Sequence, residues 1–263
     1  MKGEMITSAQ NPKVKLLQEL QQKSAVRRRH GLFVVEGRRE VERCLRSGYE
    51  LDTVFVCPDI FGVSESAIAW ETDKTCLLTP YIYNKVAYRG GTEGVIAEVR
   101  VREHSLHTLR LPSQPLIVVL ESVEKPGNLG AVLRTADAAH VDAVVVCDPL
   151  TDLYNPNLIR SSTGAFFSVP CVACTSEECI DFLRRHGIRI LTAQLQDSSL
   201  YYDTDMTAPT AIVMGTEATG LTNLWREAAD AHIRIPMLGS VDSLNVSVSA
   251  AILVYEAVRQ RQR

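Results

Sequence analysis

The sequence predicts an α/β protein with a mostly parallel sheet covered by helices on both faces. Short apolar runs of strand length alternate with helical segments along the chain, and the runs at 116–120 and 143–147 consist almost entirely of Val, Leu, Ile, Ala and Cys. Strands that are buried on both faces have this continuous apolar character. Hydrophobic residues make up 46% of the 263 positions, which is sufficient for a large core.

The first hundred residues predict a small α/β domain. We expect helices at 8–22, 38–46, 64–71 and 80–86, and strands at 32–37, 51–57, 75–78 and 95–101. Pro12 near the start of the first segment, followed by Val14, Leu17 and Leu20, favours an amphipathic helix. The polar stretch that follows ends in two prolines and has no clear period. We therefore expect one domain at 1–104, a linker at 105–115 and a second domain at 116–263.

The second domain repeats the alternation of strand and helix. We expect strands at 116–120, 143–147, 167–172, 188–193, 211–215 and 231–235, and helices at 129–139, 155–162, 176–186, 221–229 and 245–260. Ligands of such sheets bind at the carboxyl ends of the strands. Three polar loops are expected at that edge, at 121–128, 215–220 and 237–245.

The charge of the chain is uneven. Residues 1–46 carry eleven Lys and Arg against five Glu, although the whole chain has a net charge of −3. Such asymmetry suggests that the N-terminal part meets a polyanion, with RNA contacts at Arg27, Arg28, Arg29 and Arg38. A solvated basic helix face is the alternative interpretation.

The cysteines and histidines do not predict a metal site. Seven Cys cannot all pair with one another, and reduced, packed thiols are the expected state. Cys171, Cys174 and Cys179 lie close in sequence, but no second pair has zinc-ribbon spacing. The longest apolar runs are too short to cross a bilayer and the start has no signal-peptide core, so we expect a cytoplasmic protein without membrane contact.

The first polar loop has the wrong spacing for a common nucleotide-binding motif. Gly127 and Gly130 flank Asn128 where strand gives way to helix, but neither G-x-G-x-x-G nor G-x-x-x-x-G-K-[ST] is present. This disfavours a nicotinamide-dependent dehydrogenase. Arg134, further along the same helix, is either an ordinary surface residue or, with Asn128, a group that holds a phosphate or ribose.

The other two loops can offer their backbone to a ligand. Gly215 lets another molecule approach the end of its strand, while Glu217 is either a partner of the helix dipole or a functional carboxylate. The last loop contains two strong helix N-cap types, Ser243 and Asn245. On its own it is also compatible with a simple strand-to-helix connection.

Taken in order, the motifs at 126–137, 214–221 and 235–248 resemble those of the SpoU (TrmH-like) branch of the SPOUT superfamily of RNA 2′-O-ribose methyltransferases. The first hundred residues, with Phe-Val-Val-Glu-Gly at 33–37, are similar to the L30e-like substrate-binding domain of many such enzymes. The resemblance implies a C-terminal domain with a deep trefoil knot. It also implies a homodimer formed through the catalytic domain.

The resemblance also implies a set of site residues. S-adenosylmethionine is expected to bind, largely through backbone groups, at Met214, Gly215, Ile235, Leu238, Ser243 and Leu244. The catalytic set is expected to be Asn128, Arg134, Glu217, Ser243 and Asn245. The chain has Thr216 before Glu217, where the family frequently has Asn or Ala. Because a guanidinium is very hard to deprotonate, orienting the RNA phosphate and stabilising the developing alkoxide is the easier role for Arg134.

The function implied by the resemblance is methyl transfer to a ribose 2′-OH of structured RNA, with 23S ribosomal RNA preferred. Transfer RNA is one alternative substrate. A catalytically silent RNA-binding or ribosome-assembly factor on the same fold is another interpretation. Three proton acceptors stay open, namely Arg134, the RNA phosphate and water.

Overall fold

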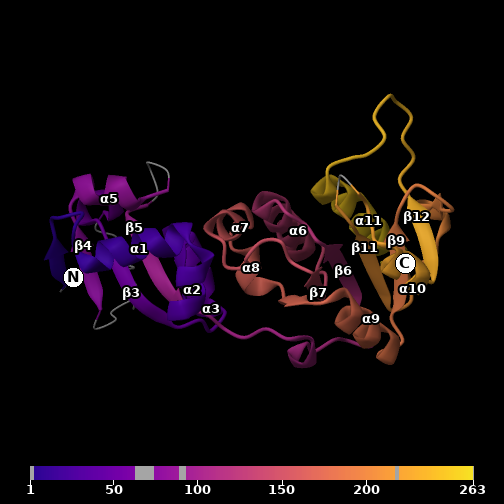
Figure 1. The fold of residues 1–263 in the computed structure, drawn as a ribbon, viewed down its shortest axis with the longest axis horizontal. Coiled ribbons are helices and arrows are strands. Elements are labelled where there is room, and N and C mark those ends of the chain that lie inside the picture. Colours follow the sequence, from indigo (N-terminus) through magenta and orange to yellow (C-terminus); the bar gives the residue numbers. More distant parts are fainter. Residues whose placement is uncertain (1–2, 63–73, 89–92, 217–218, 263) are drawn as a thin grey trace. The chain divides into compact units, whose positions relative to one another are not determined.

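The computed structural model describes residues 3–62, 74–88, 93–216 and 219–262, which form two compact units (Figure 1). The first unit consists of Met1–Arg102 and Tyr154–Phe167, and the second of Glu103–Leu153 and Ser168–Arg263. The helix expected at 64–71 lies outside the described residues.

The first unit contains a mixed five-stranded sheet. Its strands are β1 (Glu4–Ile6), β2 (Leu32–Glu36), β3 (Leu51–Val56), β4 (Thr75–Leu78) and β5 (Val95–Arg100). The order is β1-β4-β3-β5-β2, with β1, β4 and β3 parallel and β5 antiparallel to both of its neighbours.

The helices that residues 1–102 contribute to the first unit are α1 (Pro12–Gln22), α2 (Ser24–His30), α3 (Arg38–Arg46), α4 (Pro58–Phe61) and α5 (Pro80–Val86). Asn11 caps α1, and its side chain accepts a hydrogen bond from Lys13 N. Helix α2, which contains three of the arginines expected to contact RNA, was not among the predicted helices, and its Val26 and Arg27 are buried.

The segment Tyr154–Phe167 departs from the predicted boundaries, which assigned it to the second domain. It contains α7 (Pro156–Ser161) and most of α8 (Ala165–Ser168), and α7 packs on β2. The Tyr154 ring lies 4.5 Å from the Phe33 ring, and the Tyr154 hydroxyl donates to Arg102 O at 2.6 Å. These aromatic contacts explain why the segment belongs to the first unit. The strand expected at 167–172 is observed later, as β8 (Cys171–Cys174).

The second unit contains a seven-stranded sheet in which every pair of neighbours is parallel. Besides β8, its strands are β6 (Leu116–Glu121), β7 (Ala143–Cys147), β9 (Arg189–Ala193), β10 (Ser199–Leu200), β11 (Thr210–Met214) and β12 (Ala231–Arg234). The order is β10-β12-β9-β11-β6-β7-β8. The prediction of a mostly parallel sheet is confirmed.

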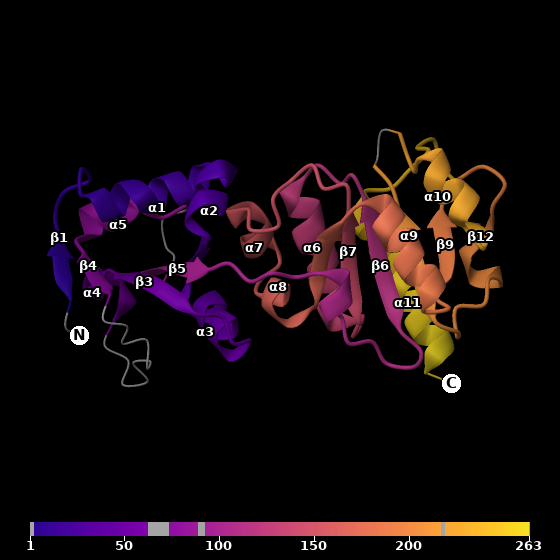
Figure 2. The same ribbon diagram turned by 60° about the horizontal axis from the view of Figure 1, so that its bottom comes forward.

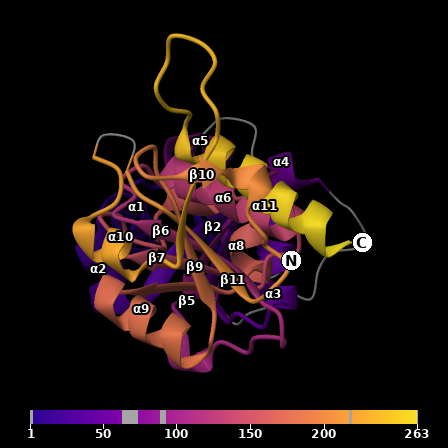
Figure 3. The same ribbon diagram turned by 90° about the vertical axis from the view of Figure 1, so that its right-hand side faces the viewer.

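Helices cover both faces of this sheet. On one face lie α9 (Ser176–Arg185) and α10 (Asn223–Ala228), and on the other lie α6 (Pro126–Ala138) and α11 (Val246–Arg261) (Figures 2 and 3). Two short 3₁₀ turns, Leu106–Thr108 and Tyr201–Asp203, complete the unit. Among the described helices, none is both long and apolar enough to cross a membrane.

Candidate active site

A cavity of about 350 Å³ lies in the second unit, at the carboxyl ends of β9, β11 and β12 and the start of α11. This is the edge at which parallel sheets of this type bind their ligands. Of the three loops predicted there, the second and the third contribute to its wall.

Gly215 is required by the close approach of its own loop. A Cβ at this position would meet the carbonyl oxygen of Gly220 and lie 2.6 Å from Leu221 N. The loop is closed by a hydrogen bond from Gly220 N to Thr216 O at 3.0 Å, and by a contact of 2.8 Å between the Thr216 and Thr219 hydroxyls. The glycine therefore allows two backbone segments to lie close together in one wall of the cavity.

The start of α11 joins the third loop to the first. Asn245, rather than Ser243, is the N-cap, because its Oδ1 accepts from Ser247 N at 3.0 Å and from Ser247 Oγ at 2.6 Å. The same side chain donates from Nδ2 to Asn128 Oδ1 at 3.2 Å. Two predicted site residues that are far apart in sequence are thus in direct contact.

A second cavity, of about 330 Å³, lies beside the first. It is lined by Asn128 and Lys125 on the α6 side, and it shares Gly215, Thr216 and Val246 with the larger cavity. The two spaces are therefore neighbours along one wall. This arrangement suits two molecules that must meet at that wall.

Arg134 lines neither of the two cavities. It lies six residues after Asn128 on α6, a rotation of about 240° around the helix axis, so the two side chains leave the helix on different faces. Arg134 is exposed and makes no hydrogen bond or ion pair with other described residues.

The remaining predicted donor-site residues are placed unevenly. Ile235, Ser243 and Leu244 line the larger cavity, as does Met214 at the end of β11. Leu238 is 95% exposed and is not part of the lining, because the segment between β12 and α11 projects from the unit (Figures 1 and 3). Glu217 lies outside the described residues.

Sequence reasoning missed two residues at this site. Glu121 is 3% exposed at the end of β6, and its carboxylate accepts from Thr222 N at 2.9 Å and from Thr222 Oγ1 at 2.7 Å. A carboxylate that directly follows an apolar strand was a usable signal. Arg226 on α10 lines the larger cavity, and its Nε is buried without a hydrogen-bond partner among the described residues. No pattern in the sequence distinguishes Arg226 from an ordinary surface arginine.

The predicted RNA contacts in the first unit divide into two groups. The prediction that Arg27 contacts RNA was wrong. Its side chain is 3% exposed, and its Nη1 donates to the carbonyl of Leu20, near the end of α1, at 2.6 Å. Arg38 is partly buried, with its guanidinium 4.2 Å from the Phe61 ring centre. Arg28 and Arg29 are exposed in the last turn of α2.

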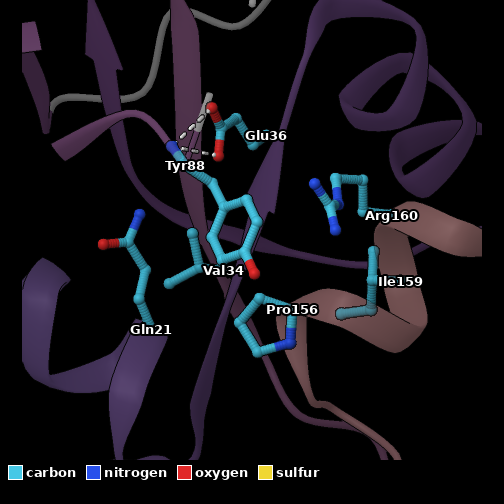
Figure 4. A pocket seen from close by; sticks show the side chains of 7 residues that line it. All are labelled: Gln21, Val34, Glu36, Tyr88, Pro156, Ile159 and Arg160. Carbon is cyan, nitrogen blue, oxygen red and sulfur yellow. Dashed lines mark hydrogen bonds between the residues drawn. The ribbon is translucent and has the colours of Figure 1, made fainter. Parts of the chain in front are cut away.

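A small cavity in the first unit is not a cofactor site. Its volume is about 20 Å³, enough for about one water molecule (Figure 4). Tyr88 N donates to both carboxylate oxygens of Glu36 at 3.1 Å, and the Arg160 guanidinium lies 4.3 Å from the Tyr88 ring centre. These contacts join the segment after α5 to β2 and to α7.

Comparison with known proteins identifies the family. Residues 115–255, more than half of the chain, match the model of the SpoU rRNA Methylase family, and residues 11–97 match the MRM3-like substrate binding domain. The chain belongs to the SpoU rRNA methylase family. It is 32% identical to the 23S rRNA (guanosine(2553)-2′-O)-methyltransferase RlmP of Bacillus subtilis, over 95% of this chain and 97% of the relative.

Solved structures agree with this assignment. An RNA 2′-O ribose methyltransferase superimposes with a TM-score of 0.85 at 39% identity, covering 98% of this chain and 100% of the other. An AdoMet-bound rRNA methyltransferase from Sinorhizobium meliloti gives a TM-score of 0.88 at 28% identity, covering 97% of each chain. The SpoU family member described here is thus an S-adenosylmethionine-dependent methyltransferase, and the predictions of fold class, family and methyl donor are confirmed.

Proposed function

We propose that this SpoU family member transfers a methyl group from S-adenosylmethionine to a ribose 2′-OH of 23S ribosomal RNA, as a homodimer and in the cytoplasm. The observation that carries the proposal is the pair of cavities that share Gly215, Thr216 and Val246. One cavity would hold the donor and the other the ribose, so that their reacting atoms meet at the common wall.

The larger cavity fits the donor. Its volume of about 350 Å³ lies within the usual range of small-molecule sites. S-adenosylmethionine supplies an electrophilic methyl group on a sulfonium. Backbone groups at Gly215, Ile235 and Leu244 would bind its adenosine part, with Ser243 and Met214 completing the wall. The unpartnered Nε of Arg226 would donate to its carboxylate.

The smaller cavity fits the ribose and its phosphate. Lys125 supplies positive charge to its wall beside the carboxylate of Glu124, and Asn128 is held in place by Asn245. Because Asn245 already orders the Asn128 side chain, Asn128 can bind a hydroxyl with little further loss of side-chain entropy. Alignment of the two reactants is worth ~7 to 11 kcal/mol in well-oriented systems.

We propose that Arg134 acts on the site of the second copy in the homodimer. It lines neither cavity of its own chain, and it is exposed. Large apolar side chains are also exposed near the donor site and along α11, with Leu238 at 95%, Val241 at 61% and Tyr255 at 49%. Covering them in a two-fold dimer would place one chain beside the cavities of the other. There Arg134 would orient the RNA phosphate and stabilise the developing alkoxide.

Three family-based expectations stay predictions. Glu217 is proposed to position the reacting groups beside Gly215. Leu238 is proposed to contact the donor through its backbone. The deep trefoil knot is proposed for the segment that runs from β11 through the last loop into α11.

Substitution of Arg134 tests the mechanism. Arg134→Ala is expected to lower methyl transfer by about 10² to 10³-fold, because one stabiliser of the developing charge is lost. Binding of S-adenosylhomocysteine, measured by isothermal titration, is expected to be unchanged. Arg184→Ala, which removes another exposed arginine of the same unit, is the matched control.

Mixed dimers test whether Arg134 acts across the interface. Gly215→Ala is expected to abolish donor binding, since its Cβ would meet the Gly220 carbonyl. Co-expression of Arg134→Ala chains with Gly215→Ala chains should restore one active site in each mixed dimer. Mixed dimers without activity would contradict the action in trans, and full activity of Arg134→Ala alone would contradict the assigned role. An inactive wild-type chain that binds RNA but no donor would instead support the silent-factor alternative.

A further inference from the structure

Three cysteines meet at one edge of the sheet in the second unit. Cys147 ends β7, Cys174 ends β8, and Cys179 lies near the start of α9. Their Sγ atoms all lie within 4.8 Å of one another. Sequence reasoning grouped Cys171 with Cys174 and Cys179 and expected no metal site, but the structure places Cys147, not Cys171, in the group.

The sheet register explains which cysteines come together. In the parallel pair of β7 and β8, Cys147 is the direct neighbour of Cys174, so their side chains leave the same face of the sheet. Helix α9 covers that face and brings Cys179 to it. Cys171 lies three positions before Cys174 and therefore points to the opposite face.

The spacing of the sulfur atoms suits a shared metal ion. A metal–sulfur distance of about 2.3 Å separates sulfur ligands by about 3.8 Å in a tetrahedral site and by about 4.0 Å in a planar three-coordinate site. Both values lie inside the observed limit of 4.8 Å.

The partly exposed member of the group gives an ion a path for entry. Cys147 and Cys179 are fully buried, whereas Cys174 is partly exposed. The thiolate is the form that binds metals.

The group contains no fourth protein ligand among the described residues. The carboxylate next to Cys147, that of Asp148, accepts hydrogen bonds from Ser176 N at 3.3 Å and from Ser176 Oγ at 2.6 Å. Structural Zn²⁺ sites almost always have four ligands. Cu(I), which soft thiolate ligands favour, accepts three sulfur ligands.

We propose that Cys147, Cys174 and Cys179 bind one thiophilic d¹⁰ metal ion, with Cu(I) favoured over Zn²⁺. Binding forms three metal–sulfur bonds, and the thiol protons are released to solvent. Neither the metal ion nor the sulfur atoms change oxidation state. The site is structural, because none of the three cysteines lines the donor cavity. It would fix the start of α9 to β7 and β8.

This edge also contacts the helix that follows the donor loop. Ser176 Oγ accepts a hydrogen bond from Trp225 Nε1 of α10 at 2.9 Å. A bound ion is therefore expected to raise the melting temperature of the protein. Metal binding and melting temperature are measured without methyl transfer. The proposed metal site and the proposed function can therefore be refuted independently.

Metal titration of the reduced, full-length protein under anaerobic conditions tests the proposal. Cu(I) buffered with bicinchoninate is added, and retained copper and thiolate-to-copper absorption are measured. We expect one Cu(I) per chain, an affinity at least 100-fold weaker in Cys147→Ser and Cys179→Ser, and no change in Cys171→Ser, the matched buried control. Where either variant unfolds, Cys174→Ser at the partly exposed position is expected to show the same loss.

Three results of this titration would contradict the proposal. Copper retention by the wild type that is no greater than that of folded Cys174→Ser would overturn the site. Equal loss in Cys171→Ser would place the metal elsewhere and also overturn it. Tighter binding of Zn²⁺ than of Cu(I), measured in the same way with a zinc-specific competitor, would overturn the assignment of copper.

Discussion

Glu98 on β5 is a buried carboxyl group whose protonation is linked to stability. It is 3% exposed, and its Oε1 has no hydrogen-bond partner within the part of the chain that the structure describes. Burial raises its pKa to about 7, and a hydrogen bond from Thr53 offsets this only in part. The folded-state pKa therefore exceeds the ordinary value, so the unfolded chain loses this proton first. The contribution of Glu98 to stability is present below about pH 4.5 and is lost as the pH rises to about 7.

Substitution by the neutral isostere checks this linkage. Glu98→Gln is expected to raise the free energy of unfolding by about 3 kcal/mol at pH 8 and to leave it nearly unchanged at pH 4.5. Urea unfolding at the two pH values measures the difference, with the exposed Glu50→Gln as control. An equal effect of Glu98→Gln at both pH values would contradict the raised pKa.

At the scale of elements, Glu121 connects two parts of the donor site. Its carboxylate joins the end of β6 to Thr222, which directly follows the loop of Gly215 and Gly220. Two donors on one residue face two carboxylate oxygens, so an amide in place of the carboxylate would bring an N–H against a donor. Leaving such a buried group unsatisfied costs about 1 to 3 kcal/mol.

Glu121→Gln is accordingly expected to lower the melting temperature by several degrees and to weaken S-adenosylhomocysteine binding about three- to tenfold. Calorimetry with and without the ligand measures both effects. Glu124→Gln, at an exposed position of the same loop, should change neither. Loss of stability with full ligand affinity would show that the contact does not shape the donor loop.

The elements that sequence patterns predict well are those with clear local signals. Pro80–Val86 and Thr75–Leu78 are observed as expected, because proline at a helix start and a short apolar run leave few alternatives. Helix α2 was missed, since three successive arginines conceal that Val26 and Arg27 face inward. Asn245 and Asn128 were both predicted, but their mutual hydrogen bond depends on pairing across 117 positions. For the same reason Tyr154–Phe167 was assigned to the wrong domain, and the contact of Cys147 with Cys174 and Cys179 was not predicted, because tertiary contacts determine both.

At the scale of the whole molecule, the charge asymmetry predicts a division of labour between the two units. Arg28 and Arg29 are exposed on α2 of the first unit, and this unit matches a substrate-binding domain. Replacing both by Ala is expected to weaken RNA binding and to reduce the slope of log K against log[salt] by about 1.4 to 1.8. Filter binding over a salt series measures the slope. Donor affinity should stay the same.

The matched control for that experiment removes two arginines of the second unit. Arg184 and Arg185 are exposed at the end of α9. Their replacement by Ala is expected to leave the slope of log K for RNA binding against log[salt] unchanged. An unchanged slope in the Arg28 and Arg29 double variant would contradict their role in RNA binding and support the alternative interpretation of a solvated helix face.

The central claim is methylation of a ribose 2′-OH in 23S ribosomal RNA, and mass-spectrometric mapping of 2′-O-methyl nucleotides tests it most directly. RNA from cells with and without the gene is compared, with complementation by the wild-type chain and by Arg134→Ala. The account predicts that one 2′-O-methyl group of 23S ribosomal RNA disappears and that only the wild-type chain restores it. An unchanged ribosomal RNA pattern, or loss of a methyl group from transfer RNA instead, would contradict it.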